Sequence, residues 1–373
     1  MKTSRLVLLL SGFKLICLAI VVVFGLLWPS FFNNKNYYYH FPWPTKPPSL
    51  ESRFLTWDTS HYLYLAENGY QKGQMSCNFF PLWPGMIRLA SFLFLGHSLI
   101  AGLVLANVLS LAAFVLLHGF LKQKDPVLAD GALFFLCIFP GSVFYLFAYS
   151  ESLFLLLGVL FFIFLFQKKY LEAGLSAFLL TLSRPLGLTV ILVVLYEFIQ
   201  CCRREKLSWR HFVFLLSVPA AVFVYLILMH AQTGNAFEFL NVQQFYAAKH
   251  SVSGLLNFKD FFRDYISFKN FHGDVDSFFD RFLFTIFICS LPVIWKYDKR
   301  FFWFTLPLGI LPPLTGSFMS YTRYLSVIFP FFVMMADIFS KSPILRFRKL
   351  AIAVMLALFL VFLIHHSNYG WAG

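Results

Sequence analysis

The stretch LEAGLSAFLLTLSRPLGLTVILVVLYEFIQ, residues 171–200, decides how this chain is organised. It is too long for one ordinary membrane helix and too short for two full ones, since each span needs roughly 20 residues. Basic pairs flank both of its ends, at 168–169 and 203–204, which favours a chain that returns to the membrane face it left. We therefore predict a short helical pair with its apex at Arg184-Pro185.

The rest of the chain repeats this pattern of apolar runs and short basic clusters. The mean hydropathy is +0.73, and only 13% of the residues are charged. Because the apolar runs are continuous rather than alternating, they favour spanning helices over a β-barrel. We predict an all-α, polytopic integral membrane protein with about eleven spans, at about 6–28, 98–120, 128–149, 152–167, 171–184, 186–200, 212–230, 281–295, 301–319, 323–340 and 349–366.

The net charge of +13 could suggest a nucleic-acid partner. However, the basic residues lie in short clusters between apolar spans, which is the positive-inside pattern of membrane proteins. We therefore expect a lipid bilayer and no nucleic acid as partner. The six cysteines show neither a disulfide framework nor zinc spacing. Nothing in the sequence requires a metal, although a divalent metal ion remains compatible with it.

The segment FFPLWPGMIRLASFLFLG, residues 79–96, sets the orientation of everything after it. If it crossed the membrane, most of the later basic clusters would face outward, so we interpret it as a surface or re-entrant segment. The N-terminal run then forms an uncleaved first helix, with the N-terminus inside and the C-terminus outside. We predict one membrane domain over 1–373, with external loops at about 29–97 and 231–280.

With this topology, polar residues of two kinds gather on the external face. Carboxylates can accept a proton, and arginines can hold a phosphate group. These residues are Asp58 and His61 in the first loop, Glu151 between two spans, Arg184 at the apex, and Arg323 at the outer end of a span. No glycine-rich phosphate loop, GxSxG or HExxH motif occurs.

The spacing of Asp58, His61 and Tyr62 places all three on one face of a helix. Thr56 could cap that helix and put Asp58 in its first turn, where the macrodipole favours an ionised carboxylate. Alternatively, Asp58 only caps a short interfacial helix that Trp57 and nearby tyrosines anchor in the membrane interface. Glu151 could equally be solvated at a turn, and Arg184 and Arg323 could extend to the lipid headgroups.

Four stretches together resemble the PIG-V family, of the GPI mannosyltransferase 2 type. They are FLTWDTSHYLYLAENGY followed by CNFFPLWPGMIR from residue 54, FPGSVFYLFAYSESLF at 139–154, LSRPLGL at 182–188, and SYTRYLSVIFPF at 320–331. The resemblance implies a C-type glycosyltransferase fold (GT-C) that uses a polyprenyl- or dolichyl-phosphate sugar on the non-cytoplasmic side. In that superfamily an acidic residue of the first external loop is the candidate base, and it maps onto Asp58.

We therefore expect an inverting transfer of a mannosyl or related hexosyl unit to a hydroxyl of a glycolipid, glycan or protein. Asp58 would be the base; Arg184, Arg323 and His61 would bind the donor phosphate; and Trp57, Tyr62, Tyr149 and Glu151 would form the substrate pocket. The chain is short for a eukaryotic member and shows no C-terminal retrieval signal. This favours a prokaryotic plasma membrane over the endoplasmic reticulum.

Two other classes of function remain open at this stage. Broken helices and intramembrane arginines also suit a transporter or flippase for lipids or small solutes. That reading predicts polar residues near the bilayer midplane and an internal repeat, and the sequence contains no such repeat. A non-catalytic scaffold is the third reading, but it gives no reason for the residues around Asp58.

Overall fold

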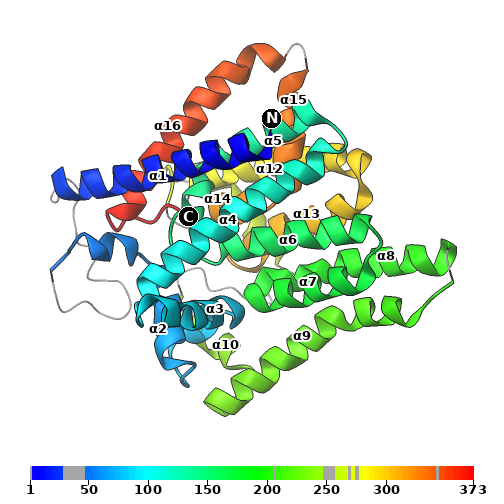
Figure 1. The fold of residues 1–373 in the computed structure, drawn as a ribbon, viewed down its shortest axis with the longest axis horizontal. Helices are drawn as coiled ribbons and strands as arrows, with labels where there is room; N and C mark the ends of the chain where they lie inside the picture. The colour runs from blue at the N-terminus through cyan, green and yellow to red at the C-terminus, as the bar shows by residue number, and fades with distance from the viewer. Residues whose placement is uncertain are drawn as a thin grey trace. The chain divides into compact units, whose positions relative to one another are not determined.

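The computed structural model describes residues 2–27, 47–204, 206–246, 257–267, 270–273, 277–341 and 344–373. Within these ranges the regular structure is helical, apart from an isolated bridge between Asn270 and Ser277 (Figure 1). The all-α prediction is therefore confirmed for this part of the chain. The chain forms two compact units, and we describe each one separately.

Unit 1 comprises Met1–Gly69, Trp83–Ser152 and Met335–Gly373. Its helical elements are α1 (Thr3–Leu27), η2 (Glu51–Phe54), α2 (Asp58–Asn68), most of α3 (Leu82–Ser91), η4 (Phe92–Phe94), α4 (Ser98–Lys122), α5 (Pro126–Ile138), η5 (Pro140–Tyr145), the end of α15 (Phe329–Ser340), η9 (Ile344–Phe347) and α16 (Arg348–Ser367).

A buried lysine in α1 ties the first helix to the centre of unit 1. The Lys14 ammonium donates to the carbonyl of Tyr145 at 3.1 Å and to Asn107 Oδ1 at 3.3 Å. An ammonium group within an apolar span is costly unless it has such polar partners. Lys14 therefore fixes α1 against η5 and α4 in one register.

Helix α3 agrees with the prediction that segment 79–96 does not cross the membrane as a simple span. Its ten residues measure about 15 Å, roughly half the hydrocarbon thickness. Trp83 anchors its buried side by donating from Nε1 to the Ala148 carbonyl at 3.0 Å. The apolar side chains of Leu93 and Leu95 beyond it are 83% and 93% exposed, as suits a segment in contact with lipid.

Unit 2 comprises Tyr70–Leu82 and Leu153–Met334. Its helical elements are η3 (Met75–Asn78), most of α6 (Glu151–Phe166), α7 (Tyr170–Ser183), η6 (Pro185–Val190), α8 (Ile191–Arg204), α9 (Trp209–Thr233), α10 (Glu238–Asn241), η7 (Val242–Phe245), α11 (Phe258–Ile266), α12 (Phe278–Tyr297), α13 (Lys299–Thr315), α14 (Tyr321–Ser326) and the start of α15.

The predicted break in segment 171–200 is present in unit 2. Helix α7 ends at Ser183, Arg184 is extended, and η6 begins at Pro185. A Cβ atom on Gly187 would lie 2.1 Å from the Leu180 carbonyl oxygen, so only glycine lets η6 approach α7 this closely. The chain thus reverses at the Arg184-Pro185 apex, and α9 packs against both α7 and α8 (Figure 1).

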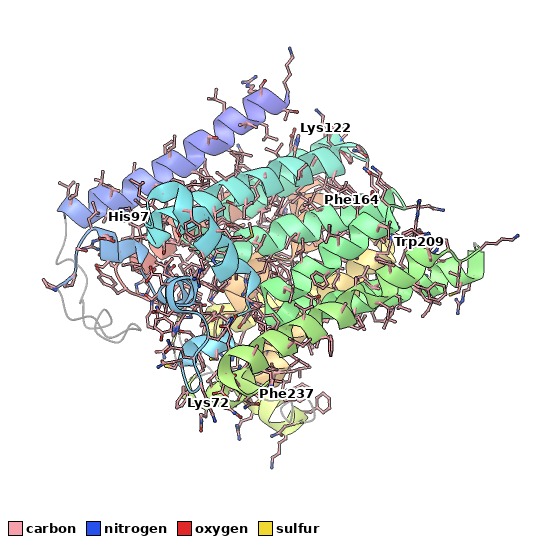
Figure 2. The ribbon with its side chains drawn as sticks, turned by 60° about the horizontal axis from the view of Figure 1, so that its bottom comes forward. Lys72, His97, Lys122, Phe164, Trp209 and Phe237 are labelled. Atoms are coloured by element: carbon pink, nitrogen blue, oxygen red, sulfur yellow. The ribbon has the colours of Figure 1, made fainter. Side chains whose placement is uncertain are left out.

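Within unit 2, parts of the two predicted external loops pack against each other. The Tyr70 amide donates to Gln232 Oε1 at 2.7 Å, and the Gly73 amide donates to Glu238 Oε1 at 2.8 Å. Figure 2 shows Lys72 and Phe237 together at this end of α9, with Trp209 at the other end. These contacts agree with a single membrane face for both loops.

Glu238 holds this contact as a carboxylate. Burial of Glu238 opposes its ionisation and would by itself raise its pKa. Hydrogen bonds from the Gly73 amide, Asn241 and Asn235, together with the nearby Lys72 charge, outweigh this effect of burial. The Glu238 pKa is therefore lowered.

Six helical segments in the described residues are long and apolar enough to cross a membrane: Thr3–Leu27, Ser98–Lys122, Pro185–Arg203, Trp209–Thr233, Phe278–Tyr297 and Leu345–Ser367. Shorter apolar helices accompany them, among them α6 and α7. An integral membrane protein is therefore supported, whereas the predicted number of eleven spans is not confirmed.

Candidate active site

Asp58 is the first residue of α2, as the sequence predicts, but Thr56 does not cap that helix. The residue preceding the helix is Trp57, and no side chain accepts a capping hydrogen bond there. Thr56 Oγ1 instead lies 2.9 Å from His366 Nε2, and Thr56 is fully buried. The predicted cap is thus wrong because a distant partner takes the hydroxyl, while the first-turn position of Asp58 is confirmed.

The backbone immediately before Asp58 is strained. Trp57 has φ 50° and ψ −117°, and the Thr59 amide donates to the Thr56 carbonyl at 3.2 Å. This is the second position of a type II′ turn, which glycine usually occupies. A tryptophan in such a conformation costs about 1–3 kcal/mol, so the surrounding contacts must hold it in place.

Those contacts come from the C-terminal tail, residues 368–373, which follows α16. Trp57 Nε1 donates to the Gly370 carbonyl at 3.1 Å, and the ring meets Trp371 edge-on at 5.4 Å between centroids. From another side, the Tyr149 hydroxyl donates to the Thr56 carbonyl at 3.1 Å. The turn that presents Asp58 is therefore held from two directions within unit 1.

The predicted pocket residues of unit 1 partly converge. The hydroxyls of Tyr62 and Ser150 lie 2.7 Å apart, and the rings of Tyr62 and Tyr149 are 6.4 Å apart and nearly perpendicular. Glu151 follows Ser150 as the first residue of α6 and is fully buried. The interpretation of Glu151 as a solvated turn residue is therefore wrong, because this end of α6 starts inside the protein.

His61 lies one turn after Asp58 on α2 and is buried, with 7% of its surface exposed. Asp58 itself is half-buried, so its carboxylate retains access to the surface. In the part of the chain that the structure describes, no group of three or more His, Cys, Asp or Glu residues is arranged to hold a metal ion.

In unit 2, Arg184 sits at the break between α7 and η6 and is only 7% exposed. Its guanidinium carbon lies 5.9 Å from the centre of the Phe154 ring and 6.0 Å from that of Tyr324. Stacking on two aromatic faces stabilises the cation inside the protein. The alternative in which Arg184 extends to the lipid headgroups is therefore not supported.

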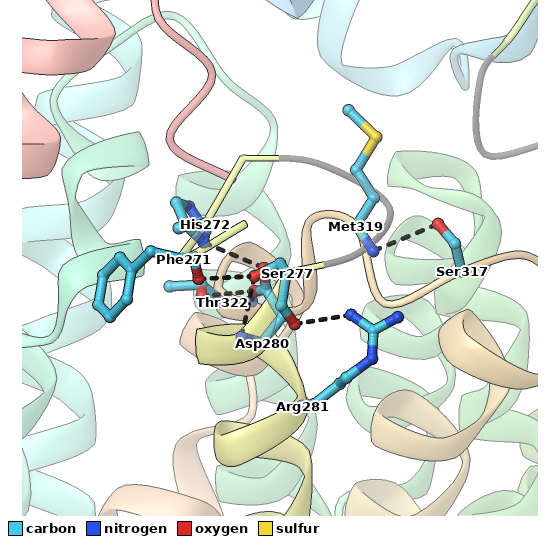
Figure 3. Close-up of polar contacts among 8 residues, drawn as sticks. All are labelled: Phe271, His272, Ser277, Asp280, Arg281, Ser317, Met319 and Thr322. Atoms are coloured by element: carbon cyan, nitrogen blue, oxygen red, sulfur yellow. Dashed lines mark hydrogen bonds and ion pairs between the residues drawn. The ribbon is translucent and has the colours of Figure 1, made fainter. Parts of the chain in front are cut away.

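Arg323, which neighbours Tyr324, is also buried, and it lies on the short helix α14 rather than at the start of a long span. Asp280 fixes this helix by accepting bonds from the Thr322 amide at 2.8 Å and the Thr322 hydroxyl at 2.7 Å. His272 Nδ1 lies 3.0 Å from the second Asp280 oxygen (Figure 3). The Arg184 and Arg323 segments thus meet at Tyr324.

Two groups that position these residues were not predicted from the sequence. The first is the tail beyond α16, for which the aromatic NYGWAG sequence was the available signal. The second is the buried pair His272 and Asp280, which fixes the residue next to Arg323. Of the predicted site residues, unit 1 holds Trp57, Asp58, His61, Tyr62, Tyr149 and Glu151, and unit 2 holds Arg184 and Arg323.

Comparison with known families points to the same stretch of chain that carries Asp58. Residues 46–205 match the mannosyltransferase (PIG-V) family. The resemblance predicted from the motifs is confirmed over this range, which includes Asp58, Tyr149, Glu151 and Arg184. Arg323 and the C-terminal tail lie outside it. No curated protein sequence matches the chain.

Solved structures with similar folds include oligosaccharyltransferases of Archaeoglobus fulgidus. One, a complex with zinc and sulfate, has 12% identity and a TM-score of 0.46, and the match covers 96% of this chain and 53% of that one. Another, AglB with an inhibitory peptide and a dolichol-phosphate, has 13% identity and a TM-score of 0.43, with coverages of 97% and 56%. The present chain therefore spans about half the length of these structures.

Proposed function

We propose that this protein is a membrane glycosyltransferase that moves a mannosyl or related hexosyl unit from a polyprenyl- or dolichyl-phosphate sugar to an acceptor hydroxyl. The observation that carries the proposal is Asp58 itself. It lies in the segment that matches a mannosyltransferase family, begins α2, and follows a strained turn held by the C-terminal tail. Strained backbone clusters at functional sites, where surrounding contacts keep it in place.

The environment of Asp58 suits a general base. Asp58 lies in the first turn of α2, at the positive end of the helix macrodipole. The residue is half-buried, so it is neither sealed in the core nor fully in solvent. A positioned base of this kind typically contributes 10²–10⁴-fold to the rate.

In the proposed step the acceptor oxygen attacks the anomeric carbon of the donor. The Asp58 carboxylate takes the hydroxyl proton as the new carbon–oxygen bond forms. The bond from the anomeric carbon to the phosphate oxygen breaks with its electron pair, which releases the lipid phosphate. Attack opposite the leaving group inverts the configuration at the anomeric carbon.

We assign the remaining roles residue by residue, each within its own unit. Arg184 and Arg323 bind the donor phosphate, where buried cations stabilise developing negative charge most strongly. His61 assists phosphate binding, and Trp57, Tyr62, Tyr149 and Glu151 form the substrate pocket. The acceptor is a hydroxyl of a glycolipid, glycan or protein, and a divalent metal ion is compatible with the step but not required by it.

Transfer by the purified protein tests this function. The protein is reconstituted in liposomes with radiolabelled polyprenyl-phosphate mannose and a glycolipid acceptor, and the product anomer is determined by NMR. We expect a labelled product whose anomeric configuration is opposite to that of the donor. The same assay is repeated with mannosyl and other hexosyl donors and with all three acceptor classes. The proposal would be contradicted if no sugar is transferred in any of them and the intact labelled lipid only moves between leaflets.

A further inference from the structure

Unit 2 contains a cavity that none of the proposed catalytic residues lines. Its volume is about 410 Å³, and its walls come from the start of α7, the end of α8, the end of α12 and the start of α13. This volume lies within the range of pockets that bind small ligands or headgroups. In Figure 2, the end of unit 2 that holds the cavity is marked by Trp209 and by Phe164 of α6, which comes just before the lining residues in the sequence. Lys72 and Phe237 mark the opposite end.

The cavity is built around an arginine that is already neutralised. Arg300 donates to Asp298 through Nε at 3.1 Å and Nη2 at 2.9 Å, and its Nη1 lies 3.9 Å from Glu197. Its guanidinium also stacks on the Phe166 ring, 3.8 Å from the centre. The two acidic residues of the lining are therefore both engaged with Arg300.

The remaining charge in the lining is positive. Lys296 at the end of α12 and Lys299 at the start of α13 bring two ammonium groups to the lining, and both side chains are exposed. Like charges repel each other, so a cluster of this kind favours an anion between them. The Lys299 ammonium also lies 5.2 Å from the centre of the Trp295 ring.

The aromatic residues of the lining indicate where that anion comes from. Trp295 and Tyr297 are 39% and 37% exposed at the end of α12, a helix long and apolar enough to span the membrane. Exposed tryptophan and tyrosine at the ends of such helices lie at the depth of the lipid headgroups. Basic pockets between spanning helices at that depth bind anionic headgroups.

We propose that this cavity binds the anionic headgroup of a membrane phospholipid, with Lys296 and Lys299 beside the phosphate and Trp295 at its edge. The site is separate from the proposed transfer chemistry, because it shares no residue with the proposed site. Binding at this cavity therefore does not depend on which group the protein transfers.

Native mass spectrometry of the full-length protein in detergent tests the proposal. Phosphatidylglycerol and phosphatidylcholine are titrated against the wild type and the double variant Lys296→Gln, Lys299→Gln. The control, Lys122→Gln with Lys124→Gln, removes the same charge from two exposed lysines outside the cavity. Each lysine near an anionic group contributes roughly fivefold to affinity, so we expect about a thirtyfold loss of phosphatidylglycerol binding in the double variant.

The control should stay within about twofold of the wild type. Phosphatidylglycerol with brominated acyl chains quenches tryptophan fluorescence, and the part of the quenching that is lost in Trp295→Phe gives a second readout of binding at this place. Equal affinity for both lipids, or equal loss in both double variants, would overturn the proposal. Displacement of the lipid by millimolar inorganic phosphate would also overturn it, since the ligand would then be a soluble phosphate compound.

Discussion

Thr56 Oγ1 and His366 Nε2 lie 2.9 Å apart although 310 residues separate them in the chain. This contact joins the turn before Asp58 to the end of α16. Together with the bond from Trp57 to the Gly370 carbonyl, it makes the C-terminal tail part of the support for the candidate base. Groups that hold a reacting side chain in place affect the rate without touching the substrate.

Trp371→Ala removes the ring that packs edge-on against Trp57. An aromatic pair of this kind contributes about 0.5–1.5 kcal/mol, and the strained turn depends on it. Since small displacements of a catalytic group are costly, we expect kcat to fall roughly tenfold while the KM for the donor changes little. Steady-state transfer kinetics measure both values.

The control is Trp209→Ala, because Trp209 is 63% exposed on α9. A purely structural role for Trp371 would lower the thermal unfolding temperature and leave the turnover of the folded fraction unchanged. That result would show that the tail does not position Asp58.

Asp280→Asn tests the buried support of α14. The change removes the charge that accepts from His272 and from both donors of Thr322. Hydrogen bonds to a charged group contribute roughly 1.5–3 kcal/mol, so we expect a loss of that size in the free energy of unfolding. Denaturant unfolding in detergent gives the value. Asp264→Asn, which removes a half-exposed carboxylate, should change it by less than about 0.5 kcal/mol.

The Glu238 carboxylate predicts a pH dependence of stability. Because the pKa of Glu238 is lower in the folded protein than in the unfolded chain, its ionisation stabilises the fold. This stabilisation is fully present above the unfolded pKa of about 4.5, and it is lost as the pH falls through the lower pKa of the folded state. The unfolding temperature of the wild type should therefore exceed that of Glu238→Gln at pH 6. The difference should shrink as the pH falls below 4.5 and disappear once the pH is below the lowered pKa of the folded state. A constant difference across this range would show that ionisation of Glu238 is not what holds the loop.

Arg184→Lys keeps the charge but loses the planar group that stacks on Phe154 and Tyr324 and can hold two phosphate oxygens. We expect the KM for the donor to rise at least about tenfold with normal expression. Arg203→Lys, an exposed change in the same unit, is the matched control. Wild-type donor use in Arg184→Ala would remove this residue from the proposed site.

The local sequence was enough to predict the helical class, the break at Arg184-Pro185 and the first-turn position of Asp58. Each depends on neighbours along the chain: apolar run length, a proline, or residues at helical spacing. The cap by Thr56 failed because a hydroxyl bonds to whichever partner the fold brings to it, here His366. The burial of Glu151 and the role of Asp280 likewise depend on contacts with segments that are distant in the sequence. The local spacing of residues could not predict those contacts.

Asp58→Asn in the radiolabelled transfer assay tests the central claim most directly. The amide keeps the size of the carboxylate but cannot take the acceptor proton. Glu67→Gln, at the exposed end of the same helix, is the matched control. We predict that Asp58→Asn folds and binds the lipid donor but transfers sugar at least about a hundredfold more slowly, while the control retains wild-type turnover. Wild-type turnover in purified Asp58→Asn would contradict the account and leave Asp58 as the start of an interfacial helix.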